Sequence, residues 1–190
     1  GGTGLLGSNL LRILAAYQRA TADEKMRLIS VSRFMPQPQD RFAEVSYKTG
    51  SALDQSFMRG LPEVDCAIYV AGTTSNYLNQ TVETVRLASE GIGTFLAHHV
   101  RAESCLLVSS ARIYGPRTDV HAALETDVCT RRSPDLRNTY DGAKLIAEAL
   151  ALAATKNGQR VVIARLGNVY GPYYGREPAI PLIQMVDEAI

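Results

Sequence analysis

The 190-residue sequence contains no tryptophan, only three histidines and only three cysteines. Cys66, Cys105 and Cys129 are scattered, odd in number and without a Cys-x-x-Cys pair, so nothing suggests a zinc site or a disulfide framework. Cys66 and Cys105 each begin an apolar run, where a free cysteine is expected to be a small buried hydrophobe. The cysteines are therefore assigned no chemistry.

Net charge and long apolar runs are also missing. Twenty basic residues face 19 acidic ones, a formal charge of +1, so no nucleic-acid partner is expected. No apolar run approaches the roughly 20 residues that span a bilayer, and no signal-peptide pattern opens the chain. With 46% hydrophobic residues, the sequence predicts a chain with its own core, no membrane partner and a cytoplasmic location.

Apolar, β-branched runs alternate with helix-period segments along the chain. We expect strands at Arg27–Ser32, Val45–Thr49, Cys66–Gly72, Cys105–Ser110 and Val161–Leu166. We expect helices at Leu6–Arg19, in a broken stretch within Asn79–Val100, at Leu136–Lys156 and from about Pro181. This alternation predicts a doubly wound α/β fold, a parallel sheet covered by helices on both faces.

A glycine-rich turn opens the chain as GGTGLLG, with Gly1, Gly4 and Gly7 at a three-residue spacing before an apolar-periodic helix. Glycines there allow a tight turn, close approach of backbone N–H groups to a pyrophosphate, and close packing of the helix on the sheet. The strand that would feed this turn is expected to be missing from the chain. A plain strand-to-helix turn also uses glycine, so the turn alone is weak evidence.

Further motifs occur in the same order along the chain. They are YVAG ending at Gly72, SSARIYG at Ser109–Gly115, YDGAK at Tyr140–Lys144 and RLGNVYGP at Arg165–Pro172. With these motifs the chain resembles the extended short-chain dehydrogenase/reductases, the group of NAD(P)-dependent nucleotide-sugar epimerases and dehydratases. The resemblance implies a Rossmann domain at 1–172 and the start of a substrate-binding lobe at 173–190, most of which is missing.

Tyr140 and Lys144 lie one helical turn apart, so their side chains share a face. A neighbouring ammonium favours the phenolate, which predicts a tyrosine tuned for acid–base catalysis. The resemblance implies that Ser110 hydrogen-bonds the reacting oxygen, that Lys144 also holds the nicotinamide ribose, and that Ser109 points to the packed side. The structural alternatives are a solvated Tyr–Lys pair and a serine that merely ends a strand.

The cofactor is expected to be NAD or NADP. Relatives that bind NAD close the second strand with an acidic residue, whereas this chain has Ser32 followed by Arg33, an arrangement suited to a 2′-phosphate. Ser51 stands where an aspartate commonly contacts adenine, with Asp54 kept nearby, and Glu90 stands where an asparagine is frequent. The expected cofactor-binding residues are Gly1, Thr3, Gly4, Leu5, Leu6, Gly7, Ser32, Arg33, Ser51, Ala52, Ala71, Gly72, Tyr140 and Lys144.

Sugar dehydratases of this group place an Asp–Glu pair after the catalytic hydroxyl residue, but here Ala111 and Arg112 follow Ser110. Without those carboxylates the chain favours an epimerase. Arg112 either contacts a substrate carboxylate or phosphate or points to solvent. The expected substrate-binding residues are Thr73, Ala111, Arg112 and Asn168.

The sequence therefore predicts an NAD(P)-dependent epimerase of a nucleotide-activated sugar, acting through Ser110, Tyr140 and Lys144. An NADP-dependent carbonyl or sugar reductase and a non-catalytic dinucleotide sensor are the alternatives. The resemblance also implies a homodimer. His98 and His99 would lie on its dimer-forming side, in a surface or core role rather than a catalytic one.

Overall fold

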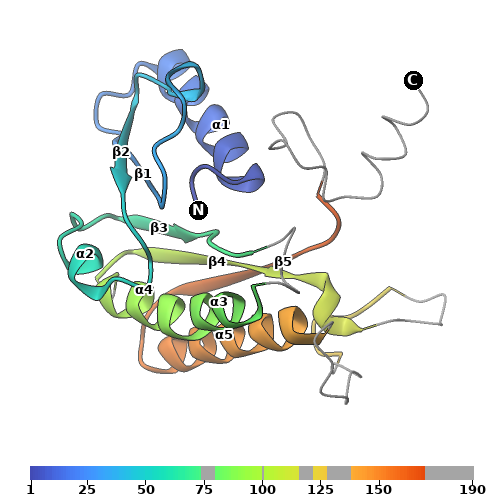
Figure 1. Cartoon of the computed structure of the whole chain (residues 1–190). Helices are drawn as coiled ribbons and strands as arrows, with labels where there is room; N and C mark the ends of the chain where they lie inside the picture. Colours follow the sequence, from blue (N-terminus) through green and yellow to red (C-terminus); the bar gives the residue numbers. More distant parts are fainter. Residues whose placement is uncertain (74–79, 100, 116–121, 128–137, 170–190) are drawn as a thin grey trace, which may run out of the picture. The chain divides into compact units, whose positions relative to one another are not determined.

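A computed structural model describes residues 1–73, 80–99, 101–115, 122–127 and 138–169 of the chain (Figure 1). The chain divides into two compact units, and the described residues of these are Gly1–Gly60 in the first and those within Leu61–Val169 in the second. Each unit is described by itself.

The first unit pairs two parallel strands with one long helix. Its elements are α1 (Leu5–Thr21), β1 (Leu28–Ser32), the 3₁₀ turn η1 (Pro38–Asp40), β2 (Val45–Thr49) and α2 (Gln55–Arg59). Along the two strands, Leu28 pairs with Val45 and Ser32 pairs with Thr49. Leu11, Leu14 and Ala15 of α1 have the spacing of one helix face and pack on the strands, with Ala15 fully buried.

The second unit is a three-stranded parallel sheet covered by helices. Its described elements are β3 (Cys66–Tyr69), α3 (Thr81–Arg86), the π-helical turn η2 (Leu87–Gly91), α4 (Ile92–His98), β4 (Ser104–Ser110), the 3₁₀ turn η3 (Ala111–Tyr114), α5 (Thr139–Lys156) and β5 (Val161–Leu166). The strand order is β3-β4-β5. Ser110 pairs with Leu166, so β4 and β5 end together at their carboxyl ends.

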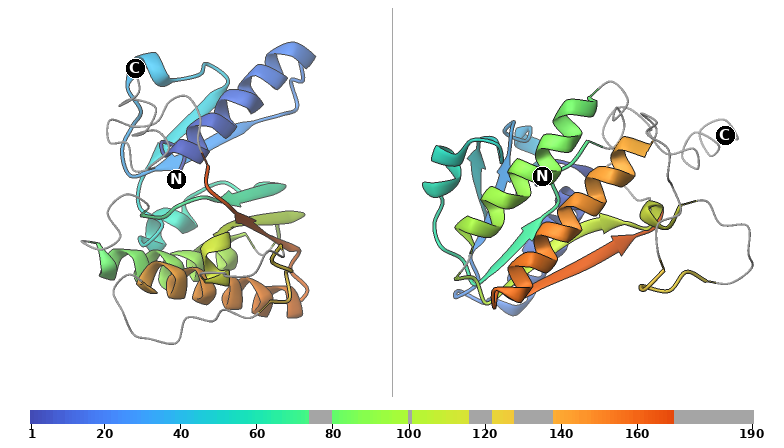
Figure 2. Two further views of the ribbon diagram at one scale, coloured as in Figure 1. Left: turned by 90° about the vertical axis from the view of Figure 1, so that its right-hand side faces the viewer. Right: turned by 90° about the horizontal axis from the view of Figure 1, so that it is seen from below.

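Helices α3, α4 and α5 lie on the same face of this sheet, with α5 beside the other two (Figure 2). Ala143, Ala147 and Ala151 recur every fourth residue on α5 and are all buried. Side chains of this size let α5 approach its neighbours closely. Lys144 and Glu148 each directly follow one of these alanines, which places two ionisable groups next to the packed surface.

A π-helical turn interrupts the helical stretch between α3 and α4. The backbone carbonyl of Leu87 accepts a 2.8 Å hydrogen bond from the buried phenol of Tyr69 on β3. A π turn contains one extra residue and frees backbone groups from the regular ladder, so a side chain can satisfy the exposed carbonyl. The broken helix predicted in this region is thus present in the described residues as α3, η2 and α4.

The α/β architecture with parallel strands is confirmed, and four of the five predicted strands agree with the structure to within one residue at each end. The strand predicted at Cys66–Gly72 is shorter, since β3 ends at Tyr69. The five-residue helix α2 was not predicted. Its N-cap, Asp54, accepts hydrogen bonds from the backbone N–H groups of Ser56 and Phe57.

The expected burial of Cys66 is wrong. Its side chain is exposed because alternate residues of β3 point to the face that the helices do not cover, whereas Cys105 on β4 is 1% exposed. Cys129, Tyr170–Pro172 and the helix predicted from Pro181 lie outside the described residues, as does the predicted lobe at 173–190. Among the helices that the structure describes, none is long and apolar enough to cross a membrane.

Candidate functional site

The glycine turn caps the N-terminus of α1 with backbone alone. Gly4 is the N-cap residue, its own N–H donates to the carbonyl of Gly1 at 3.1 Å, and no side-chain hydrogen bond caps the helix. Thr3 and Gly4 are exposed, and Leu5 and Leu6 begin the helix. The first N–H groups of a helix lack intrahelical partners and carry the positive end of its dipole.

Gly7 allows this turn to close. A Cβ atom on Gly7 would lie 2.7 Å from the Cα atom of Gly2 and closer still to the carbonyl oxygen of Gly1. Real side chains do not tolerate such contacts, so only glycine fits where the helix crosses the turn. The geometry agrees with the role that the spacing predicts for the third glycine, close packing at a phosphate-binding turn.

The carboxyl end of β1 carries Ser32 and Arg33. Ser32 is buried, and its hydroxyl donates to the carbonyl of Phe34 at 2.8 Å, so it is used within the turn. Arg33 is exposed, with its guanidinium carbon 5.9 Å from the centre of the Phe34 ring. An exposed cation therefore directly follows the last residue of β1.

Ser51 and Asp54 are both used locally. The hydroxyl of Ser51 accepts a 3.2 Å hydrogen bond from the backbone N–H of Leu53, and Ala52 lies between them. The Asp54 carboxylate accepts from Ser56 and Phe57 at the start of α2, and these hydrogen bonds hold its pKa below the ordinary value. The retained aspartate is thus a helix cap in this structure.

In the second unit, Ser110 and Tyr140 come together from different elements. Ser110 is the last residue of β4 and is 9% exposed, while Tyr140 lies in the first turn of α5. A hydrogen bond joins their side chains and lowers the pKa of the phenol. Ser109, one residue earlier, instead donates to the buried carboxylate of Glu148.

Lys144 completes this group one turn along α5. Its Nζ atom lies 5.6 Å from the centre of the Tyr140 ring and donates to the carbonyl of Val108 at 2.9 Å. Burial lowers the pKa of Lys144 from 10.5 to about 8, against an opposing effect of Glu148. Its ammonium group is therefore held by the strand that carries Ser110.

The pKa of Tyr140 differs in direction from the sequence-based expectation. Burial raises the pKa above the ordinary value and outweighs the hydrogen bond from Ser110 and the charge of Arg112, both of which lower it. Asp141 raises the pKa further. The expectation considered the neighbouring ammonium and not the desolvation of the phenolate, which disfavours charge in a buried site.

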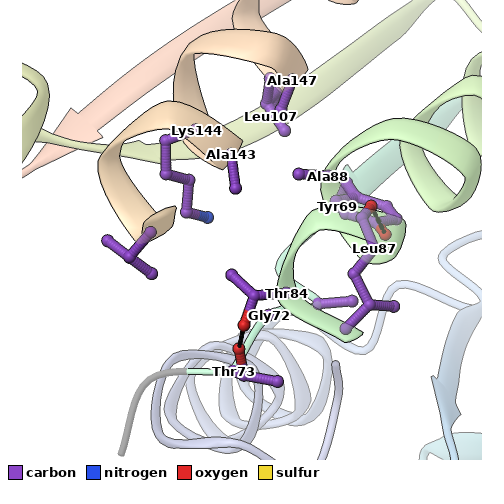
Figure 3. A pocket seen from close by; sticks show the side chains of 12 residues that line it. Tyr69, Gly72, Thr73, Thr84, Leu87, Ala88, Leu107, Ala143, Lys144 and Ala147 are labelled. Atoms are coloured by element: carbon purple, nitrogen blue, oxygen red, sulfur yellow. Dashed lines mark hydrogen bonds between the residues drawn. The ribbon is translucent and has the colours of Figure 1, made fainter. Parts of the chain in front are cut away.

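A pocket opens beside these residues, and Figure 3 shows that Lys144 and Thr73 line it from different segments. Its volume is about 320 Å³, open solvent at its mouth included. Gly72 lies beside the lysine, since a Cβ atom on it would be 3.8 Å from Lys144 Nζ. The pocket is lined by Tyr69, Ala71, Gly72, Thr73, Thr84, Leu87, Ala88, Leu107, Tyr140, Ala143, Lys144 and Ala147.

Thr73 does not present a free hydroxyl to this pocket. It is buried, and its hydroxyl forms a short hydrogen bond with that of Thr84 on α3 (Figure 3). Ala111 is half-buried in η3, and Asn168 is exposed just after β5. The structure thus places three of the predicted substrate-binding residues at or beyond the carboxyl ends of the parallel strands.

Sequence reasoning missed two carboxylates of the site, Asp141 and Glu148, and the ion pairs that they form. Arg112, expected at substrate or in solvent, forms an ion pair with Asp141, while Glu148 pairs with Arg165 at 2.8 Å. Arg165 also donates to the Tyr114 phenol at 3.0 Å. Asp141 and Glu148 lie in the helix that carries Tyr140, but their partners come from segments far away in sequence, so no local spacing signalled these pairs.

Glu90, which stands where an asparagine is frequent, pairs with Arg86 on the surface of its own helical stretch at 2.8 Å. Neither residue contacts α5 through that ion pair. In the described part of the chain, His, Cys, Asp and Glu side chains form no group of three that could hold a metal ion.

Each unit, taken by itself, has features that suit one part of a dinucleotide. In the first unit, a glycine-rich turn leads into the helix N-terminus, which allows the close approach of a pyrophosphate. In the second, a buried lysine and a glycine at a strand end border the pocket. Backbone N–H groups would hold phosphates, and Lys144 would hold a ribose hydroxyl.

Comparison with known proteins identifies the family. Residues 1–189 match the sequence profile of the NAD dependent epimerase/dehydratase family. The chain belongs to this family. A search of curated proteins gives no significant match.

Solved structures of epimerases and dehydratases share the fold. The dTDP-glucose 4,6-dehydratase of Streptomyces venezuelae, solved with NAD, is 21% identical with a TM-score of 0.81 over 99% of this chain and 61% of its own. The UDP-glucose 4-epimerase of Thermotoga maritima, solved with UDP-glucose, is 17% identical with a TM-score of 0.80 over 99% and 60%. RMD from Pseudomonas aeruginosa, complexed with NADPH, is 21% identical with a TM-score of 0.71 over 99% and 58%.

These likenesses confirm the Rossmann fold that the sequence predicts. The chain spans 58–61% of the length of the three proteins. It is a member of an NAD-dependent family, and neighbours of its fold have been crystallised with NAD and with NADPH.

Proposed function

We propose that this protein is an NAD(P)-dependent epimerase of a nucleotide-activated sugar that acts by transient oxidation of a sugar hydroxyl. The observation that carries the proposal is the group formed by Ser110, Tyr140 and Lys144 beside a pocket at the carboxyl end of β4. Ligands of open α/β sheets bind at that edge. Fold neighbours that modify dTDP-glucose and UDP-glucose support the substrate class.

In this proposal the dinucleotide, when bound, supplies the hydride acceptor and donor. Tyr140 exchanges the proton of the reacting hydroxyl, and Ser110 hydrogen-bonds the same oxygen. Lys144 adds positive charge and a hydrogen-bond donor at the ribose. Because burial raises the pKa of Tyr140, the phenol is protonated at neutral pH, ready to return a proton when a carbonyl is reduced.

An epimerase is favoured over a dehydratase by the residues after Ser110. Elimination of water needs a general acid and base near the leaving hydroxyl, and Ala111 supplies neither. Arg112 is always protonated, so it cannot exchange that proton. Inversion of the oxidised carbon itself moves only the hydroxyl proton, which Tyr140 exchanges, so it needs no further carboxylate at this position.

The test is a set of nucleotide sugars incubated with the full-length protein and catalytic NAD or NADP, with products identified by NMR. We expect an epimer and no net change in reduced dinucleotide. Tyr140→Phe keeps dinucleotide binding by calorimetry but loses turnover, because packing is retained and the acid–base group is removed. Near wild-type turnover in Tyr140→Phe overturns the assignment. Dinucleotide binding without any turnover identifies a sensor instead.

The second candidate is an NADP-dependent carbonyl or sugar reductase. Arg33, exposed at the end of β1 where an acidic residue would favour NAD, supports it because a guanidinium suits a 2′-phosphate. The two activities differ in stoichiometry. A reductase consumes one reduced dinucleotide for each carbonyl, whereas an epimerase consumes none.

We propose in addition that the protein acts as a homodimer. Apolar side chains on α3 and α5 support this, since Val82 is 72% exposed and Leu152 is 56% exposed. Light scattering of the full-length protein tests it, and Leu152→Glu is expected to shift the mass toward that of a monomer. A monomeric wild-type mass contradicts the proposal.

A further inference from the structure

Arg112 and Asp141, which lie close in sequence to Ser110 and Tyr140 respectively, form an ion pair with each other. Arg112 lies in η3, two residues after Ser110, and Asp141 lies in α5, directly after Tyr140. The Nε atom of Arg112 donates to the Oδ1 atom of Asp141 at 2.9 Å. This ion pair ties the turn after β4 to the first turn of α5.

The pair is asymmetric in burial. The side chain of Asp141 is 2% exposed, whereas that of Arg112 is 45% exposed. A buried carboxylate without a partner is costly, so Asp141 needs the guanidinium more than the guanidinium needs Asp141. The buried member therefore fixes the position of the exposed one.

The position so fixed is next to the tyrosine ring. The guanidinium carbon of Arg112 lies 5.6 Å from the centre of the Tyr140 ring, within the range of a cation–π contact. Its charge lowers the pKa of the phenol, and the charge of Asp141 raises it by a smaller amount. The pair as a whole thus favours the phenolate.

Lys144 cannot supply this charge alone. Its Nζ atom is equally far from the ring centre, at 5.6 Å, but its pKa is lowered to about 8 by burial. A lysine in that state loses its charge at the alkaline pH where a phenolate forms. Arginine stays protonated throughout this range.

We propose that Asp141 and Arg112 form a positioning pair for Tyr140, in which the buried carboxylate holds a permanent cation beside the ring and so supports loss of the phenolic proton. Arg112 is then a positioning residue rather than a contact for the substrate. The proposal rests on the acid–base role of Tyr140 in the proposed function. Among the described residues, the charged groups beside the phenol are Arg112 from η3, and Asp141 and Lys144 from α5.

The experiment is a pH titration of the full-length protein labelled with [13Cζ]tyrosine, followed by NMR, with the Tyr140 signal assigned by its loss in Tyr140→Phe. We expect Arg112→Ala to move the midpoint of the Tyr140 phenol titration, here called the Tyr140 midpoint, to higher pH. The variant removes the cation and leaves the Asp141 carboxylate. We expect Arg112→Ala/Asp141→Asn to bring the midpoint back toward wild type, because the opposing charge is then gone as well. Loss of a merely structural contact is not reversed by a second loss.

Activity gives a second readout. In Arg112→Ala we expect kcat to fall about tenfold with KM unchanged, since the charge acts on proton transfer and not on substrate binding. Arg112→Lys keeps the charge without the planar guanidinium and is expected to retain most of the wild-type midpoint. If Arg112→Ala does not fold, Arg112→Gln removes the charge from a side chain of similar length and is expected to raise the Tyr140 midpoint, whereas Arg112→Lys is not.

The matched control is the surface pair of Arg86 and Glu90, another 2.8–3.0 Å ion pair in the same unit. Arg86→Ala and Arg86→Ala/Glu90→Gln are expected to leave the Tyr140 midpoint unchanged. The proposal is overturned if Arg112→Ala leaves that midpoint in place, or if the double variant is shifted as far as the single one. A protein that turns over no substrate refutes the proposed function, whereas the NMR titration still decides the role of the pair.

Discussion

The ammonium group of Lys144 donates a 2.9 Å hydrogen bond to the backbone carbonyl of Val108, two residues before the end of β4. Helix α5 is thus connected to the strand that carries Ser110 by a side chain as well as by packing. A fully buried cation would cost stability, and the pKa of Lys144 falls to about 8 for that reason.

Lys144 is expected to titrate far from the other lysines. An NMR titration of [13Cε]lysine should show one signal with a midpoint near 8, against about 10.4 for exposed lysines, and this signal should be absent from Lys144→Arg. Because the folded pKa lies below the unfolded value of 10.5, the cost of burying the ammonium is fully present below about pH 8 and fades as pH rises to 10.5.

Glu148 raises the pKa of Lys144, so Glu148→Gln should move that midpoint to still lower pH. Glu90→Gln, which removes an exposed carboxylate paired with Arg86, is the control and should leave it in place. A Lys144 midpoint near 10.4 would show that the ammonium is solvated and that the site is more open than the structure has it.

Gly7→Ala is expected to abolish tight dinucleotide binding. Its methyl group would lie 2.7 Å from the Cα atom of Gly2, so the turn must open. Gly93→Ala in α4 is the control, since a Cβ atom there meets nothing within 4 Å and alanine is the better helix former. Calorimetry with NAD and NADP should give at least a tenfold loss, about 1.4 kcal/mol, for the first variant alone. Equal dinucleotide affinities in the two variants would show that the glycine turn is not part of the binding site.

Arg33→Ala distinguishes the cofactors. If Arg33 contacts a 2′-phosphate, its loss should weaken NADP binding at least about tenfold, in line with the 1.5–3 kcal/mol of a hydrogen bond to a charged group, and leave NAD binding unchanged. Arg27→Ala, an exposed arginine at the amino end of the same strand, is the matched control. A parallel loss of NAD and NADP binding would contradict a specific 2′-phosphate contact.

His99 should make the fold sensitive to acid. Burial and the nearby His98 lower the pKa of His99 from 6.5 to about 4, and its ring packs edge-on against Phe95 at 4.8 Å. Between these two pH values the unfolded chain binds more protons than the folded one. The contribution of His99 to the free energy of unfolding is therefore fully present above pH 6.5 and is lost as pH falls toward 4.

Urea unfolding at about pH 7.5 and about pH 5 measures this effect. The urea concentration at the unfolding midpoint should fall less from about pH 7.5 to about pH 5 in His99→Gln than in wild type, because glutamine does not gain a proton. His98→Gln, in which the neighbouring and less buried ring is replaced, serves as the comparison. An identical fall in wild type and His99→Gln would assign the acid sensitivity to other groups.

Local patterns predicted most of the fold. Strands such as Val45–Thr49 and Val161–Leu166 are apolar and β-branched, and α1 and α5 have clear helical periodicity, so tertiary contacts had little to change. The short helix α2 was missed because five residues are too few to show a period. Its signal, Asp54 followed by Ser56 and Phe57 as capped N–H groups, was visible in sequence as an aspartate before a helical turn.

The candidate site was only partly predictable. The spacing of Tyr140 and Lys144 gave their shared helix face, and the resemblance gave Ser110 its place. Sequence could not give the raised pKa of Tyr140, because desolvation depends on what covers the phenol. Nor could it pair Arg112 with Asp141, which are 29 residues apart and meet only when η3 packs on α5.

Sequence alone determined the alternation of strands and helices, the glycine-rich turn before α1, and the order of the hydroxyl, phenol and ammonium groups along the chain, since each depends on residues near one another. The tertiary structure decided which charges surround the phenol and how deeply the lysine is buried. Those properties arise from burial and from partners distant in sequence, and electrostatic energies in a protein depend on both.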